Sequence, residues 1–144
     1  MIALSSPLLV GIYDKGQLVK TYEKFEQTSD ALPKVMEEIL KTYKIINIYF
    51  ANGPGSFMAI KVAYIFLKTL SVSLGCKIFA SDGFAFNDNS PIRALKKVYF
   101  IKENGKIKTN ITSEEFLQNF FLPQFLDKDI FSKNCEPLYI LPAV

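Results

Sequence analysis

A glycine-rich turn with the sequence NGPGSF occupies residues 52–57 and constrains the fold more than any other part of the chain. Residues 45–51 before it are rich in β-branched and aromatic side chains and contain no Gly or Pro, which predicts a buried strand. Residues 56–74 after it predict a long helix, with Ser56 as its N-cap. Gly53 and Gly55 permit a tight turn and the close approach of another segment. A strand, a turn and a helix in this order indicate an α/β protein.

The other elements of the first ninety residues fit the same class. Short apolar segments predict an antiparallel meander with strands at 2–4, 8–13 and 18–22. Residues 77–80 predict a strand parallel to the one at 45–51, and Gly75 is a C-cap for the helix before it. A first helix, with N-caps offered by 28–30, is predicted by apolar side chains at helical spacing, namely Leu32, Val35, Met36, Ile39, Leu40 and Tyr43.

The last third of the chain has a different pattern. Residues 88–91 collect turn-forming side chains, so we predict two lobes, 1–90 and 91–144. In the second lobe we expect a hairpin with strands at 98–101 and 107–111, a helix at 112–120 that starts with capping-box spacing, and an extended segment at 137–142. The predicted fold is therefore a mixed sheet flanked by helices, followed by a small second lobe.

Composition argues against several classes of function. The net charge of +3 comes from lysines that are scattered along the chain, which gives poor support for direct nucleic-acid binding. The chain has no histidine, the usual base of covalent hydrolases, and Cys76 and Cys135 lie far apart without metal-site spacing, so we interpret them as apolar filler. The N-terminus does not have the pattern of a secretion signal, so we expect a cytoplasmic protein.

The long helix is unusually apolar. Its polar side chains form one narrow line, Lys61, Tyr64, Lys68 and Ser71. The two lysines disfavour a membrane span, so we predict a buried helix of a soluble protein. Because one sheet cannot cover so wide an apolar arc, either the second half of the chain or another subunit is expected to cover the rest, the plain intramolecular core being the simpler alternative.

Three segments together resemble the TsaB family, also called YeaZ. They are the glycine turn GPGSF at 53–57, the sequence SDGF at 81–84, and EPLY at 136–139. The resemblance implies a ribonuclease-H-like lobe of the actin-like and sugar-kinase-like superfold. It also implies a role as the non-catalytic partner of TsaD, the subunit that makes N6-threonylcarbamoyladenosine next to the anticodon of transfer RNA.

The sequence departs from the family pattern at several points. Residues 3–7 read ALSSP where the family usually has a strand that ends in an aspartate. Residues 28–30 stand where the family often has a histidine, and 94–99 lack the common aspartate-alanine-arginine motif. The second lobe is also shorter than usual. These departures predict a reduced and divergent member without catalytic or metal-binding residues of its own.

Three hypotheses remain. The first is a scaffold that binds a TsaD-type subunit and forms a homodimer when alone. It needs no cofactor, touches transfer RNA only indirectly and does not enter a membrane. Docking of a TsaE-type ATPase is left open. The expected interface of the scaffold is Phe57, Ala59, Ile60, Ala63, Tyr64, Phe66, Leu67, Met36 and Leu40. The alternative is a nucleotide-binding ATPase or kinase-like protein with a weak anion site at Gly53, Gly55, Ser56 and Lys61. A peptidase or other hydrolase is the third.

Overall fold

The computed structural model describes residues 1–138. Within these residues it contains two α-helices, three small sheets and two short 3-10 turns at Gly83–Phe86 and Lys128–Ile130. The main elements follow in the order β1 (Leu8–Asp14), β2 (Gln17–Lys24), α1 (Thr28–Thr42), β3 (Asn47–Ala51), α2 (Phe57–Leu74), β4 (Lys77–Ser81), β5 (Ile92–Leu95), β6 (Val98–Glu103) and β7 (Lys106–Ile111). The predicted mixed α/β class is confirmed. The expected extended segment at 137–142 lies mostly outside the described residues.

The N-terminal segment joins the first two sheets. β1 pairs antiparallel with β2, and β3 pairs parallel with β4, as predicted. Ile2 exchanges two backbone hydrogen bonds with Leu9 of β1, of 2.8 and 3.0 Å. Met1 is bonded to β3 in the same way, since its carbonyl oxygen accepts from the N–H of Ala51 at 3.0 Å. The strand predicted at 2–4 is thus reduced to a single bridge that links an antiparallel and a parallel ladder.

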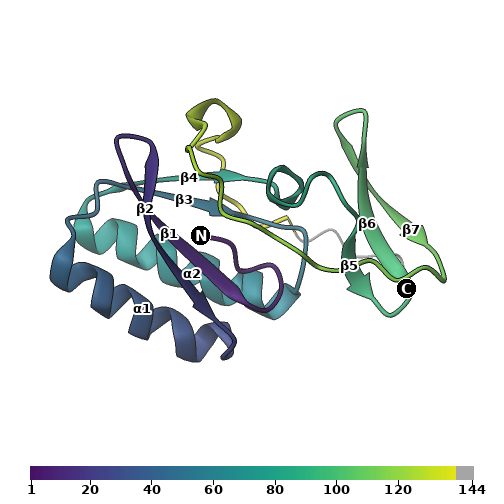
Figure 1. The fold of residues 1–144 in the computed structure, drawn as a ribbon, viewed down its shortest axis with the longest axis horizontal. Coiled ribbons are helices and arrows are strands. Elements are labelled where there is room, and N and C mark those ends of the chain that lie inside the picture. The colour runs from purple at the N-terminus through teal and green to yellow at the C-terminus, as the bar shows by residue number, and fades with distance from the viewer. Residues whose placement is uncertain (139–144) are drawn as a thin grey trace.

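The two helices lie side by side on one face of these strands (Figure 1). Leu32, Val35 and Ile39 of α1 pack against Leu8 and Val10 of β1, and all five side chains are buried. This confirms the apolar face predicted for the first helix. α1 begins after Gln27 without a side-chain capping bond, so the N-cap predicted at 28–30 is wrong.

The opposite face of the strands is covered by the segment that follows β7. Phe120, Leu122 and Phe131 pack against a cluster that contains Ile2 and Leu4. Backbone bonds add to this contact, including Leu18 N–H to the carbonyl of Gln124 and an exchange between residues 80 and 132. The division of the chain near residue 90 stays a prediction. The C-terminal segment therefore covers the side of the sheet that faces away from the helices.

The hairpin of β6 and β7 is confirmed, and the helix predicted after it is wrong. Asn104 and Gly105 both have positive φ, of 50° and 76°, as a two-residue hairpin turn requires. Residues 112–120 are irregular instead of helical. The side chain of Thr112 accepts from Glu114 N–H at 3.1 Å, which is a local turn in place of a capping box, and Tyr99 Oη accepts from the N–H of Phe116. Tertiary bonds to β6 replace the hydrogen bonds that a helix would form.

Candidate partner interface

The glycine turn is built around the N-terminal segment. The N–H of Ser56 donates to the carbonyl of Leu4 at 2.9 Å, and the N–H of Gly83 donates to the carbonyl of Gly53 at 2.9 Å. A Cβ atom at position 55 would lie 2.7 Å from the oxygen of Leu4, so only glycine fits there. Gly53 has a φ of 126°, which other residues rarely adopt. The turn fixes the start of α2 against the sheet.

The residues predicted as a weak anion site take part in these contacts. Ser56 precedes α2 as its N-cap residue but makes no side-chain capping bond, so the expected bond is wrong. The backbone N–H of Ser56 donates to the carbonyl of Leu4. On the other side of the turn, a Cβ atom on Gly53 would lie 2.9 Å from the backbone oxygen of Leu138. Lys61 is exposed one turn along the helix. The chain itself therefore packs against both sides of the turn. Anion binding at these residues stays a prediction.

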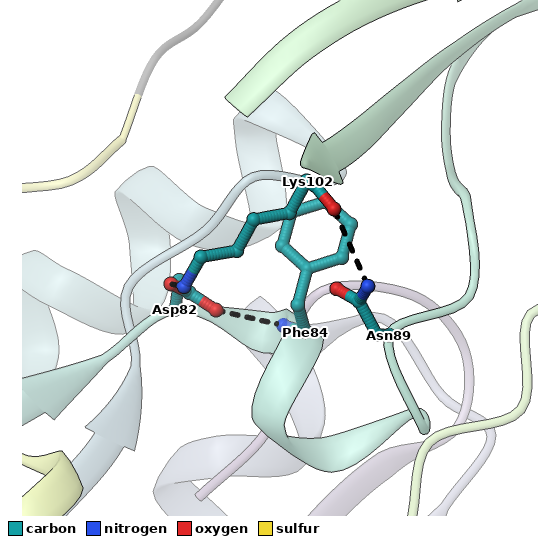
Figure 2. A network of polar contacts seen from close by, with 4 residues as sticks. All are labelled: Asp82, Phe84, Asn89 and Lys102. Carbon is teal, nitrogen blue, oxygen red and sulfur yellow. Dashed lines mark hydrogen bonds and ion pairs between the residues drawn. The ribbon is translucent and has the colours of Figure 1, made fainter. Parts of the chain in front are cut away.

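A second group of polar side chains lies at the end of β4 (Figure 2). One oxygen of Asp82 accepts from the N–H of Phe84 at 3.0 Å, and the other accepts from Lys102 Nζ at 2.6 Å. Asn89 donates to the carbonyl of Lys102 at 3.3 Å. No three His, Cys, Asp or Glu side chains gather as a metal site within residues 1–138. The carboxylate therefore has a cation and a backbone donor, and it holds β6 against the end of β4.

Loss of this ion pair should lower stability modestly. The side chains of Asp82 and Lys102 are only 18% and 31% exposed, so solvent screens the pair less than a surface pair. We expect Lys102→Met to reduce the free energy of unfolding by about 1 kcal/mol, measured by urea denaturation. Lys108→Met is the matched control, because its pair with Glu103 is 3.9 Å long and exposed. Equal effects for the two variants would contradict the structural role of Asp82.

The outer face of α2 carries exposed apolar side chains, which an ordinary buried helix does not have. Ile60, Ala63, Leu67 and Ser71 point into the core and are buried. Met58, Ile65 and Val72 point outward and are 65%, 53% and 76% exposed. They recur every seven residues, with Val62 and Thr69 between them, which is the spacing of a seam in helix-to-helix packing. Lys61 and Lys68 are exposed beside this row. We call Met58, Val62, Ile65, Thr69 and Val72 the α2 seam.

The residues predicted for the interface differ in their exposure in the isolated chain, and their role in binding stays a prediction. Those already buried inside the chain are Met36, Ile60, Ala63 and Leu67. Those partly buried are Ala59, Tyr64 and Phe66, and the exposed ones are Phe57 and Leu40, at 42% and 40%. Sequence reasoning missed Met58, Ile65 and Val72, although their seven-residue spacing was a usable signal.

The predicted polar line on α2 was wrong at two of its positions. Ser71 is buried, because its hydroxyl donates to the carbonyl of Lys68 at 2.8 Å and needs no water. Tyr64 is half-buried, with its ring 6.4 Å from that of Phe50. Lys61 and Lys68 of the line do face solvent. An almost uniformly apolar helix gives a weak amphipathic signal, so the sequence could not fix which side faces outward.

By length and composition, α2 could also cross a membrane, and only 22% of it is buried. The helix is therefore much less buried than the sequence predicted. However, β3 and β4 on either side of α2 are paired in parallel, with Asn47 opposite Lys77 and Ala51 opposite Ser81. Their pairing requires the connecting helix to run back along the sheet. An exposed apolar face on a helix held in this way is typical of a surface that binds a protein or a membrane.

Comparison with solved structures supports the resemblance in the sequence. YeaZ from Pseudomonas aeruginosa superimposes with a TM-score of 0.59 at 14% identity, over 77% of this chain and 62% of YeaZ. The chain has the YeaZ fold. A protein described as uncharacterized, with similarity to peptidase YeaZ from Pseudomonas aeruginosa, gives a TM-score of 0.54 at 13% identity with the same coverage. No family model and no curated protein matches this sequence. The chain thus matches less than two thirds of the length of these YeaZ structures.

Proposed function

We propose that this chain is a TsaB-type, non-catalytic subunit that binds a TsaD-type enzyme and supports threonylcarbamoyl transfer to transfer RNA. The observation that carries the proposal is the α2 seam, whose apolar side chains Met58, Ile65 and Val72 are exposed in a chain with the YeaZ fold. The C-terminal segment covers the other side of the sheet, so it leaves this row open. A desolvated apolar centre with charges at its edge is the composition of a specific protein interface.

The proposed docking geometry pairs helices with helices. Within the proposed ribonuclease-H-like lobe, α1 and α2 lie together on one face of the strands (Figure 1). The α2 seam would pack against helices of the matching lobe of TsaD, with Leu40 of α1 and Phe57 at its edges and Lys61 and Lys68 as its polar rim. The same face would form a homodimer when the partner is missing, because a self-complementary apolar row can pair with its own copy.

This function is tested by reconstituting the modification reaction. The purified TsaD-type subunit, the enzyme that supplies the threonylcarbamoyl adenylate, ATP and unmodified transfer RNA are combined with and without this chain. We expect N6-threonylcarbamoyladenosine, quantified by mass spectrometry of the nucleosides, only when the chain is present. Full modification in its absence would refute the role. A calorimetric titration of the chain alone with ATP tests the nucleotide-binding alternative, which predicts measurable heat.

A further inference from the structure

A polar cavity of about 580 Å³ lies where the parallel strands β3 and β4 end. Asn52, which follows β3, lines it together with Ser81 and Asp82 at the end of β4. The cavity is also lined by Lys102 of β6, by the hairpin turn after β6 and by the C-terminal segment between residues 130 and 138. Its volume is in the range of small-molecule sites, and the carboxyl ends of parallel strands are a recurrent place for ligands in α/β proteins.

The cavity presents one charge of each sign. Of the described residues that line it, Asp82 and Lys102 are the charged ones, and Figure 2 shows their side chains facing each other. Lys102 Nζ carries three protons and gives one to Asp82, and each Asp82 oxygen accepts one bond and can accept a second. Both side chains are partly exposed, so they can also contact a ligand. A phosphate chain would need cations that are not already paired, so this lining favours a net-neutral ligand.

Asn52 adds an acceptor that the chain leaves unused. The residue is 7% exposed, and its Oδ1 has no hydrogen-bond partner in the described part of the chain. Its backbone N–H donates to the carbonyl of Ser81, and its carbonyl accepts from the N–H of Leu138. Its Nδ2 donates to the carbonyl of Glu136 at 2.8 Å, which fixes the orientation of the amide. A buried acceptor without a partner is unfavourable, so a donor that the chain does not supply would stabilise it.

We propose that this cavity binds a free α-amino acid in its zwitterionic form. The ammonium group would donate to Asp82 and to Oδ1 of Asn52, and the carboxylate would accept from Lys102. Asn52 and Asp82 follow Ala51 and Ser81, which stand opposite each other in the parallel pair, so the two acceptors lie at the same edge of the sheet.

The charge pattern of the cavity matches that of the ligand. In an α-amino acid the two charged groups share one carbon atom, so their separation suits an ion pair as close as 2.6 Å. Each charge of the ligand then faces the opposite charge of the protein, and the bond between Asp82 and Lys102 stays intact. No residue of α2 lines the cavity, so this proposal does not depend on docking through the α2 seam.

The test titrates the isotope-labelled full chain with L-serine and follows the amide signals by NMR. Two control ligands each lack one charge: ethanolamine is serine without the carboxylate, and 3-hydroxypropanoate is serine without the amine. Mg-ATP is the fourth compound and represents the nucleotide alternative. Asp82→Asn removes the negative charge but keeps an oxygen that can accept from Phe84 N–H. Asp88→Asn is the matched control variant, because Asp88 is exposed and does not line the cavity.

The proposal predicts saturable shifts of the Asn52 side-chain amide and of the backbone amides at 82–84 with L-serine. The two control ligands should bind at least about tenfold more weakly, because each loses a charge-assisted contact. Asp82→Asn should weaken serine binding by at least about tenfold for the same reason, and Asp88→Asn should leave it unchanged.

Three results would overturn the proposal. They are the absence of a saturable shift at these residues with serine, a control ligand that binds as tightly as serine, and shifts of the same amides by Mg-ATP at a lower concentration than by serine. Thermal unfolding checks that both variants are folded. If Asp82→Asn does not fold, the four compounds on the original chain still decide between these results.

Discussion

Replacing Ile65 and Val72 together by aspartate should weaken binding to a TsaD-type partner by at least about 100-fold, which corresponds to about 3 kcal/mol. Both side chains are exposed in the isolated chain, at 53% and 76%, so the fold does not need them. In the proposed complex they become buried, and a carboxylate there would lie in an apolar contact without a cation to pair with. The loss should therefore appear in binding and leave folding unchanged.

The matched control for this double variant is Ile111→Asp. Ile111 lies at the end of β7, is 78% exposed and is not part of the α2 seam. Isothermal titration calorimetry with the partner gives the dissociation constants, and thermal unfolding checks that all variants are folded. We expect Ile111→Asp to bind as the original chain does. If the double aspartate variant binds equally well, the α2 seam is not the interface.

Gly55→Val should lower the free energy of unfolding by about 3 kcal/mol, the range seen for overpacking against a rigid neighbour. A Cβ atom there would lie 2.7 Å from the oxygen and 3.1 Å from the Cα atom of Leu4. These are backbone atoms, and the same oxygen accepts the bond from Ser56 N–H. They cannot move aside as a flexible side chain would. The N-terminal segment and the start of α2 would have to separate.

Gly75→Asn is the control for this substitution. Gly75 ends α2 with a φ of 69°, and a Cβ atom there would meet nothing within 4 Å. Asparagine tolerates this conformation, so its cost should stay below about 1 kcal/mol. Urea denaturation measures both variants. A Gly55 variant as stable as the Gly75 variant would show that Leu4 is not held closely against the turn.

The sequence predicted those parts of the fold that depend on local patterns. The C-cap at Gly75, the hairpin of β6 and β7, the apolar face of α1 and the parallel pairing of β3 with β4 were predicted from such patterns. The helix expected at 112–120 failed because its competitors are distant in sequence, with Tyr99 and Arg93 bonding to that segment. The capping-box spacing at the start of this segment involves only neighbouring residues, so it cannot reveal partners that are distant in the sequence.

The sequence predicted nine interface residues on the two helices, and four of them, Met36, Ile60, Ala63 and Leu67, are buried inside the chain. An apolar excess on α2 was visible in the sequence, but its direction depends on which side meets the sheet. In the structure Tyr64 and Ser71 lie toward the core, where the Tyr64 ring is near that of Phe50 and the Ser71 hydroxyl donates to the Lys68 carbonyl of its own helix. That rotation brings Met58, Ile65 and Val72 to the surface. Only the packed structure gives this information, since the pattern of the helix alone fits more than one orientation.

Site-specific photocrosslinking tests the proposed interface most directly. A benzophenone amino acid is placed at position 65 in the α2 seam or at position 111 on β7, and each chain is irradiated with the purified TsaD-type partner. Crosslinks to the partner from position 65, with none from position 111, are the expected result. Crosslinks from position 111 alone, or from neither position although the proteins co-elute, would contradict docking through α2.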